Sequence, residues 1–240
     1  MLKAVFFDLD GTLLPLDEET FAKGYMKLLC KKMIPYSYDP NLLVKVIYEG
    51  VKYMYMNDGK KSNEEVFWDT FLKYYPKDKL ADKSIFDSFY SNEFKEAKVF
   101  TGENKLAKSI VNFVKENGLI SVLSTNPIFP YVGQRTRLSF INLKPEDFAY
   151  VTSYENSRYC KPNPLYFKDL LEKFSLKPEE VILFGNNDYE DGDCASSLGI
   201  KVYLIKRCII HSPHAKGKYE EIDIEDVESM ILKEIKERNC

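Results

Sequence analysis

The sequence has few of the residues that build disulfide frameworks or zinc sites. Its two histidines, His211 and His214, lie in a segment punctuated by Pro213 and Gly217, which is typical of a solvated loop rather than a metal site. Its five cysteines are scattered without a C-x-x-C pair: Cys30, Cys160, Cys194, Cys208 and Cys240. We therefore expect reduced thiols, and neither a disulfide framework nor a zinc site.

Long apolar runs and a dominant charge are also absent. No apolar stretch approaches the ~20 residues of a membrane span, and the first apolar run is broken at Asp8. Basic and acidic residues number 34 and 37, so the formal net charge of −3 gives no field that would attract nucleic acid or an anionic membrane. The sequence therefore predicts a cytoplasmic protein with no nucleic-acid or membrane partner, and it leaves the oligomeric state open.

Residues 15–100 have the texture of helices. Only three glycines occur there, and amphipathic runs alternate with short breaks rich in proline, asparagine and glycine. Four helices fit this stretch: 18–32, 41–56, 64–75 and 84–94. Tyrosine is frequent in it, and we expect these rings mainly to fill the core of a small helical unit; the alternative is a pocket for a planar or apolar substrate group.

Downstream, short apolar strands alternate with amphipathic helices. The predicted strands after the first one, 4–7, are 119–123, 148–152, 181–184 and 202–205. The predicted helices are 104–116, 131–138, 164–174, 190–198 and 224–235. This alternation indicates an α/β protein with a doubly wound, parallel, Rossmann-like sheet. Residues 1–14 and 101–240 would form this core, and residues 15–100 would be an inserted helical cap domain.

Two carboxylates stand where the first strand ends. Asp8 and Asp10 follow the apolar run 4–7, and Gly11 gives the backbone freedom for a sharp turn. Ligands of open α/β sheets bind outside the carboxyl ends of the strands. Clustered anions repel each other unless a cation or hydrogen-bond donors offset the repulsion, which suits a metal-assisted nucleophile beside a proton-transfer group. The alternative is that both residues only tighten a turn.

Three further strand ends carry polar residues. Thr125 and Asn126 suit a phosphate cradle, with an ordinary helix N-cap as the alternative. Lys161, whose backbone is fixed by two prolines, suits clustered carboxylates and a phosphoryl group, with a solvated surface lysine as the alternative. The loop 185–193 is acidic and rich in amides, as a Mg²⁺ site or an acidic helix start would be. Polar residues of these kinds at all four strand ends are far less expected by chance than such residues at any one strand end.

Taken in order, these motifs resemble those of the haloacid dehalogenase superfamily. The similar segments are Asp8-Leu9-Asp10-Gly11-Thr12 for the first motif, Thr125-Asn126 for the second, Lys161-Pro162-Asn163-Pro164 for the third and Gly185 to Asp191 for the fourth. The resemblance covers nearly the whole predicted core, and the set of motifs is highly specific. The position of the helical insertion, between the first and second motifs, matches a cap of the first type.

The resemblance implies a mechanism. Asp8 would be the nucleophile that forms an aspartyl-phosphate, and Asp10 would be the general acid for the leaving group and then the base for water. Thr125, Asn126 and Lys161 would bind the substrate at its phosphoryl group, with Lys161 also stabilising Asp8. Since the dehalogenase branch generally lacks an aspartate at the position of Asp10, phosphate chemistry is favoured over carbon–halogen cleavage.

The resemblance also implies a Mg²⁺ site. Its ligands would be Asp8, the backbone carbonyl of Asp10 and the side chain of Asn186, with Asp191 as a further candidate. Many relatives have an aspartate at position 186. An amide oxygen can bind Mg²⁺ but lacks a full negative charge, so we expect weaker metal binding unless Asp188 or Asp191 contributes through water.

The leading functional hypothesis is a Mg²⁺-dependent phosphohydrolase acting on a small phosphorylated metabolite. A phosphomutase or phosphotransferase of the same superfamily is the nearest alternative, because the same aspartyl-phosphate can return its phosphoryl group to a sugar hydroxyl. A non-catalytic sensor of a phosphorylated ligand is the alternative from a different class, because a fold does not establish an activity. Substrate identity lies in cap side chains that the sequence does not orient.

Overall fold

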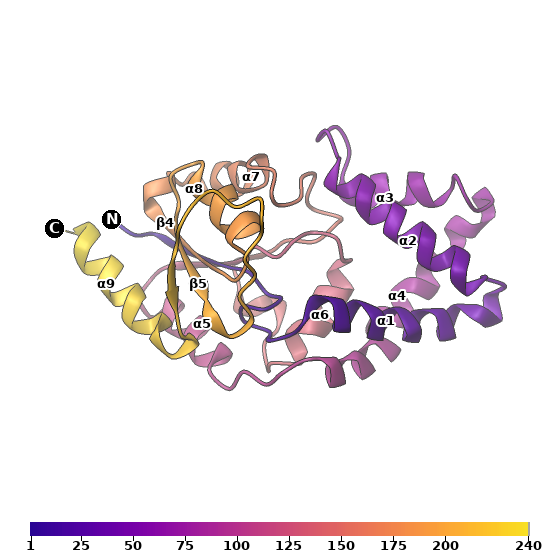
Figure 1. Cartoon of the computed structure of the whole chain (residues 1–240), viewed down its shortest axis with the longest axis horizontal. Coiled ribbons are helices and arrows are strands. Elements are labelled where there is room, and N and C mark those ends of the chain that lie inside the picture. Colours follow the sequence, from indigo (N-terminus) through magenta and orange to yellow (C-terminus); the bar gives the residue numbers. More distant parts are fainter. Residues whose placement is uncertain (240) are drawn as a thin grey trace.

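The computed structural model describes residues 1–239. Its strands form a six-stranded parallel sheet in the order β3-β2-β1-β4-β5-β6. The strands are β1 Ala4–Phe7, β2 Ile120–Leu123, β3 Tyr150–Val151, β4 Val181–Gly185, β5 Lys201–Ile205 and β6 Glu220–Ile222. Figure 1 shows this sheet at one end of an elongated molecule, where both termini also lie.

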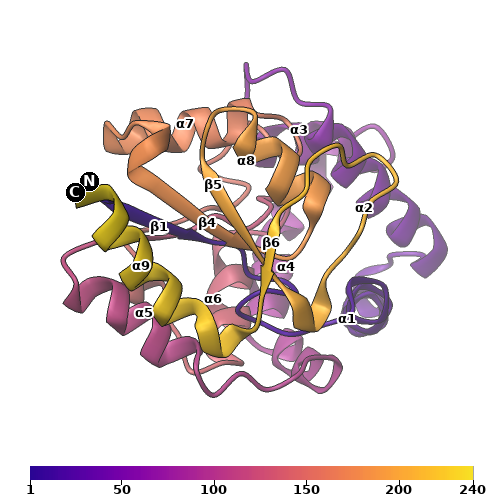
Figure 2. The same cartoon turned by 60° about the vertical axis from the view of Figure 1, so that its left-hand side comes forward.

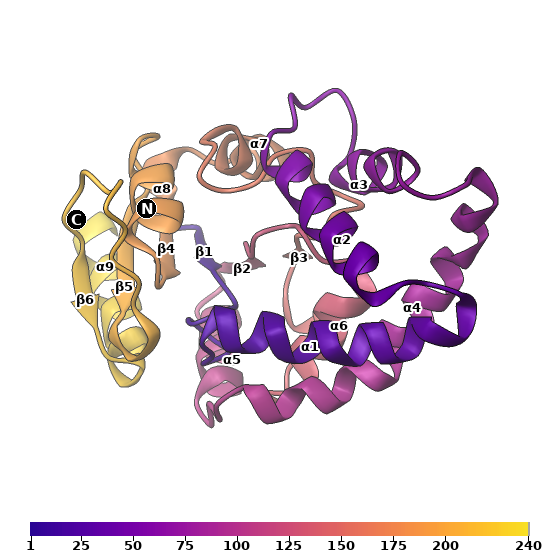
Figure 3. The same ribbon diagram turned by 45° about the vertical axis from the view of Figure 1, so that its right-hand side comes forward.

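Along the chain the helices fall into two groups. Between β1 and β2 lie α1 Glu18–Met33, α2 Pro40–Tyr55, α3 Asn63–Phe71, α4 Lys83–Ser91 and the 3₁₀ segment η3 Glu93–Phe100. After η3 come α5 Ala107–Glu116, α6 Tyr131–Ser139, α7 Leu165–Phe174, α8 Cys194–Ser196 and α9 Val227–Asn239. In space, α6 of the second group lies beside α1 of the first (Figures 1 and 3). No helix of residues 1–239 is long and apolar enough to cross a membrane.

Alternate residues of β1 enter two separate cores. Val5 and Phe7 pack in the core that also contains residues of α5 and α9, whereas Ala4 and Phe6 pack in the core that contains residues of α7. All four side chains are fully buried. Figure 2 shows α7 and α8 on one side of the sheet and α5 and α9 on the other. The predicted α/β class and the doubly wound parallel sheet are therefore confirmed.

The register of the central strands aligns their carboxyl ends. Phe7, the last residue of β1, lies opposite Leu123 of β2 and Phe184 of β4. The next residues continue the pairing, because Asp8 N donates to Phe184 O (2.9 Å) and Ser124 N donates to Phe7 O (2.7 Å). The segments that follow β1, β2 and β4 therefore begin side by side at one edge of the sheet.

Local capping explains where the first three inserted helices begin. Asp17 caps α1 by accepting from Thr20 N (2.9 Å), and Asp39 caps α2 by accepting from Leu42 N (2.8 Å). Ser62 begins α3 with a capping box. Helices α1 and α2 match the predicted helices 18–32 and 41–56 within one residue at each end.

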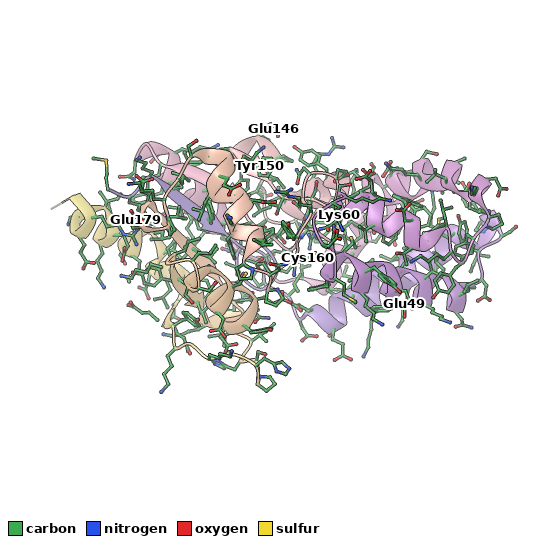
Figure 4. All side chains as sticks on the ribbon, turned by 90° about the horizontal axis from the view of Figure 1, so that it is seen from above. Glu49, Lys60, Glu146, Tyr150, Cys160 and Glu179 are labelled. Atoms are coloured by element: carbon green, nitrogen blue, oxygen red, sulfur yellow. The ribbon has the colours of Figure 1, made fainter. Side chains whose placement is uncertain are left out.

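The insertion is anchored to the core at the start of α3. Asn63 is fully buried, its N donates to Ser157 O (2.8 Å), and its Nδ2 donates to Pro127 O (3.2 Å) and Cys160 Sγ (3.3 Å). Figure 4 shows Cys160 and Lys60 where the side chains of the core and of the insertion meet. Because buried N–H groups that have hydrogen-bond partners are costly to expose, these three contacts of Asn63 help to fix the insertion on the core.

Several predicted elements differ from the observed ones. The predicted helices 64–75 and 84–94 end early, at Phe71 and Ser91. The predicted strand 148–152 is reduced to β3, although backbone hydrogen bonds from Ala149 N to Ser121 O (2.8 Å) and from Thr152 N to Leu123 O (3.1 Å) extend its pairing at both ends.

The fourth predicted motif and the last strand also differ. The predicted helix 190–198 begins two residues earlier, as a π-helical turn, η6 Asp188–Asp193, and continues directly into the short α8, which ends at Ser196. This turn is held by side chains, because Asn187 Oδ1 accepts from two backbone N–H groups at its start. Strand β6 was not predicted, since only Ile222 of its three residues is buried and an edge strand needs no apolar pattern.

Candidate active site

The loop after β1 brings both of its carboxylates to one cavity. Asp8 is buried, while the side chain of Asp10 keeps 24% of its surface exposed. Gly11 has φ +77°, and a Cβ there would lie 2.1 Å from Asn186 Nδ2. Glycine is therefore required at this position, both for the turn and for the close approach of the β4 loop.

Lys161 connects two of the predicted site residues. Its Nζ lies 2.7 Å from Asp8 Oδ1 and 2.6 Å from Asp191 Oδ1, and its side chain is 2% exposed. The neighbouring carboxylates raise the pKa of Lys161 above its ordinary value and outweigh the opposing effect of burial. A permanently charged lysine therefore stands between the segments after β1 and β4.

The pKa of Asp8 is raised to about 8, mainly by burial. Asp191 and Asp10 add to this rise by charge repulsion, and Lys161 opposes it. A further cation beside Asp8 would therefore be strongly favoured, because it would stabilise the ionised carboxylate that a nucleophile requires.

Both carboxylate oxygens of Asp191 are used within the protein. Oδ1 accepts from Lys161, and Oδ2 accepts from the backbone N of Asn186 and of Asn187, each at 3.1 Å. Asp191 thus orients the lysine and shapes the loop. Asp188 is turned away toward the loop after β5, where it accepts from Ser212 N (2.8 Å) and lies 3.1 Å from His211 Nδ1.

Asn186 presents its amide oxygen to Asp8. Its Nδ2 donates to Cys208 O (2.8 Å), which fixes the orientation of the amide. The hydroxyl of Thr12 then lies 3.5 Å from Asn186 Oδ1 and 3.4 Å from Asp8 Oδ2, so these two oxygens converge. A carboxylate and an amide oxygen are suitable Mg²⁺ ligands, and a backbone carbonyl would complete the set. The residues present therefore fit Mg²⁺.

The residues after β2 are arranged less simply than predicted. Thr125 is buried and lines the cavity. Asn126 Nδ2 donates to Tyr55 OH (2.9 Å) and Glu190 Oε2 (3.0 Å), and Asn126 Oδ1 accepts from Lys161 N (3.2 Å). Asn126 therefore holds Lys161 in place and links the core to the end of α2.

Arg137 is a site residue that the sequence did not indicate. It lies on α6, is fully buried, and its Nη1 forms an ion pair with Asp10 Oδ2. Its spacing on the predicted helix, three residues after Gln134 and next to Leu138, is the signal that could have indicated an inward-facing arginine. Gln134 and Leu138 are both buried in the structure.

The site opens into a cavity of about 640 Å³ between the sheet edge and the inserted helices. Asp8, Thr125, Lys161 and Asn186 line it, and so does Asp10. Its remaining walls are largely apolar and aromatic: Phe21, Tyr25, Met26, Ile47, Tyr48, Val51, Ile128 and Phe129. Three of the tyrosines of the insertion thus face the cavity rather than only filling the helical core: Tyr25, Tyr48 and Tyr55.

Acidic side chains outside the four predicted motif positions of the site also line the cavity. Glu18 is the first residue of α1, and Glu190 lies on η6. Glu18 is exposed to solvent, but desolvation of its carboxyl group in the cavity is the main cause that raises its pKa to about 7, and the nearby charges of Asp10 and Glu190 add to the rise. The cavity beyond the cluster around Asp8 is therefore electronegative.

Comparisons with known proteins agree with this geometry. The sequence matches the family of haloacid dehalogenase-like hydrolases over residues 2–199. Glyceraldehyde 3-phosphate phosphatase from Pyrococcus furiosus is 26% identical over 233 residues, which cover 93% of this chain and 85% of the relative.

Solved structures share the fold. A HAD phosphatase from Thermococcus onnurineus superposes with a TM-score of 0.57 at 17% identity, covering 96% of this chain and 98% of its own. The 2-haloacid dehalogenase from Pseudomonas syringae pv. Tomato DC3000 superposes with a TM-score of 0.63 at 14% identity, covering 97% and 99%. The family match and the phosphatase relatives support the predicted enzyme class. Since the family match spans more than half of the chain, this protein belongs to the haloacid dehalogenase-like hydrolases.

Proposed function

We propose that this protein is a Mg²⁺-dependent phosphohydrolase that acts on a small phosphorylated metabolite through an aspartyl-phosphate on Asp8. The observation that carries the proposal is the arrangement around Asp8 at the floor of the cavity. Lys161 holds one of its oxygens, and the other faces Thr12 and Asn186. A carboxylate fixed in this way is oriented for in-line attack on phosphorus.

The chain's own residues supply the first step. One oxygen of Asp8 bonds to phosphorus while the bond from phosphorus to the ester oxygen breaks, and that oxygen keeps the electron pair. Asp10, two residues away on the same loop, gives its proton to the departing oxygen. Lys161 and Thr125 bind phosphoryl oxygens. Asp10, now ionised, then removes a proton from the water that releases phosphate from Asp8.

Asp8, the backbone carbonyl of Asp10 and Asn186 would hold Mg²⁺. When bound, this ion would neutralise the negative charge of the phosphoryl group during transfer. We propose that Asp191 acts through Lys161 and the loop backbone, because its two oxygens already accept three hydrogen bonds.

We further propose that residues 15–100 act as a cap over this site. Support comes from the cavity walls, which belong mostly to α1 and α2 on one side and to the sheet edge on the other. Closing such a cavity excludes bulk water and places the leaving group against cap side chains.

Phosphate release from p-nitrophenyl phosphate in the presence of Mg²⁺ tests the proposal. We expect turnover by the wild type and none above background by Asp8→Asn, which keeps the size of the side chain but lacks the nucleophilic charge. Retained turnover in folded Asp8→Asn would reject the covalent mechanism, and no turnover by the wild type on a panel of phosphate esters would reject the hydrolase. With a hexose phosphate, free phosphate supports hydrolysis, whereas an isomeric sugar phosphate indicates a mutase.

A further inference from the structure

Arg137 is a buried charge with one anionic partner. The guanidinium is fully buried on α6, and Asp10 is the only carboxylate that forms an ion pair with it among residues 1–239. Burying a guanidinium is unfavourable unless its charge is paired and its N–H groups are satisfied. The ion pair with Asp10 is therefore the contact that makes an arginine tolerable at this position.

The guanidinium is also held at Nη2 and on one face, whereas its Nε has no hydrogen-bond partner among residues 1–239. Its Nη2 donates to Gln134 Oε1, and its central carbon lies 4.1 Å from the centre of the Phe129 ring. Phe129 in turn packs against Tyr25 of α1, with ring centres 5.4 Å apart. A planar group fixed by an amide, a ring and a carboxylate has little freedom, so it fixes the carboxylate as well.

The two oxygens of Asp10 are in different situations. Oδ2 accepts from Arg137, whereas Oδ1 is buried and has no hydrogen-bond partner in the described part of the chain. A buried acceptor without a partner is unfavourable, so Oδ1 would be stabilised by a donor from a bound substrate or by a proton of its own. Asp10 and Phe129 line the cavity, and Arg137 lies behind them and does not.

From this geometry we propose that Arg137 is a positioning residue for Asp10. It occupies Oδ2, so that any proton carried by Asp10 sits on Oδ1, where it can pass to the ester oxygen of the leaving group. As the phosphorus–oxygen bond breaks, that proton goes to the departing oxygen, which keeps the bonding electron pair, and Asp10 remains as a carboxylate paired with Arg137. This inference rests on the proposed phosphohydrolase function.

Two substrates with different leaving groups distinguish a positioning role of Arg137 from a merely structural one, because loss of a structural role would affect both substrates equally. Benzyl phosphate and p-nitrophenyl phosphate are similar in size, but the alcohol of the first is a poor leaving group that needs a proton and the phenol of the second is a good one that does not. The measurement is kcat/KM, because it reports the steps up to formation of the aspartyl-phosphate and excludes the later role of Asp10 as a base.

We expect Arg137→Met, which keeps the volume and removes the charge, to lower kcat/KM about 100-fold for benzyl phosphate and less than about threefold for p-nitrophenyl phosphate. Arg137→Lys, which keeps a charge without the planar fork, should recover part of the loss. In a variant that already carries Asp10→Asn, adding Arg137→Met should lower kcat/KM for benzyl phosphate by a further factor of less than about two, since the two residues act as one unit.

Equal losses on both esters, or additive losses in the double variant, would overturn the inference and leave the phosphohydrolase intact. Asp8→Asn is measured in parallel, and retained activity there would reject the aspartyl-phosphate on Asp8, whereas no turnover of either ester by the wild type would count against the proposed hydrolase. Thermal melts monitor folding. If Arg137→Met does not fold, two other variants test the inference by the same comparison of the two esters. These are Arg137→Lys and the double variant of Asp10→Asn with Arg137→Met, which leaves no unpaired carboxylate at position 10.

Discussion

At the scale of single residues, the amide of Asn186 has two tasks. Its Nδ2 donates to Cys208 O, which leaves Oδ1 facing Asp8 and Thr12. In Asn186→Asp, the second carboxylate oxygen would face the carbonyl of Cys208 without a donor between them. The added charge would favour a bound cation, but the lost hydrogen bond should cost about 1–3 kcal/mol in the metal-free protein.

Thermal melts over a Mg²⁺ titration measure both effects. We expect Asn186→Asp to melt at a lower temperature than the wild type without Mg²⁺, and to gain more from Mg²⁺ because its apparent affinity is higher. An unchanged apparent affinity would contradict the view that the amide weakens metal binding.

The raised pKa of Glu18 predicts how the stability of the protein depends on pH. Its pKa is raised from 4.5 to about 7, so the folded chain binds more protons than the unfolded chain between these values. Stability contributed at this position is therefore present at low pH and is lost as the pH rises through 7. Glutamine has no carboxyl group to ionise, so Glu18→Gln does not lose stability in this way. The melting temperature of the variant minus that of the wild type should therefore be higher at pH 8 than at pH 5.

The matched control for this experiment is Glu19→Gln. Glu19 is the next residue on α1 and forms an exposed ion pair with Lys23. Its substitution should shift the melting temperature by a similar, small amount at both pH values, because exposed pairs contribute little. A pH-independent effect of Glu18→Gln would contradict the electronegative environment inferred for the cavity.

At the scale of elements, the end of α2 is tied to the core by one hydroxyl. Tyr55 OH accepts from Asn126 Nδ2 (2.9 Å) and lies 3.4 Å from Glu190 Oε1. Removing it in Tyr55→Phe should weaken this contact by about 1 kcal/mol. Hydrogen exchange of the backbone amides at 55–60 should then become about fivefold faster, because local opening is more frequent.

Tyr53→Phe is the control on the same helix. Its hydroxyl makes no hydrogen bond within the described residues; the contact of Tyr53 is with Lys73, whose Nζ lies 4.4 Å from the ring centre. Exchange at 55–60 should be unchanged in this variant. If Tyr55→Phe exchanges like the wild type, Tyr55 is not a tether, and other contacts, such as those of Asn63, hold the insertion on the core.

At the scale of the whole molecule, we expect the cavity between the inserted helices and the core to select leaving groups by charge. Beyond the cluster around Asp8, its charged lining residues are Asp17, Glu18, Glu19, Glu190 and Lys23. The single lysine of this set is already paired with Glu19. A leaving group with a negative charge would therefore meet carboxylates without a free cation, which is unfavourable in a partly desolvated site.

Matched aryl esters test this selectivity. We expect 4-(aminomethyl)phenyl phosphate to exceed 4-(carboxymethyl)phenyl phosphate by at least about tenfold in kcat/KM at low salt. Glu18→Gln should narrow the ratio, and so should Glu19→Gln, which removes a lining carboxylate and leaves Lys23 without its partner. A preference for the carboxylate ester would show that the cavity walls do not select in this way.

Much of the fold was predictable because its signals are local. Apolar runs of β length, capping residues such as Asp17 and Asp39, and the alternation of strands with helices all act over a few residues. The prediction was wrong where tertiary contacts override local preference. Helix 190–198 begins two residues earlier as the π-helix η6, whose first N–H groups are capped by Asn187, and ends at Ser196, while β6 is an edge strand with two exposed glutamates.

By itself, the sequence determined that Asp8, Thr125 and Asn186 would meet, because polar residues just after parallel strands share one edge of the sheet. Lys161 lies ten residues beyond the end of β3, so its arrival at this edge depends on the path of a loop. Only the tertiary structure decided which atoms pair. The ion pair of Arg137 with Asp10 joins residues 127 apart, and the three hydrogen bonds accepted by Asp191 depend on the path of a single loop. Such partners are chosen by burial and distance, which no local pattern encodes.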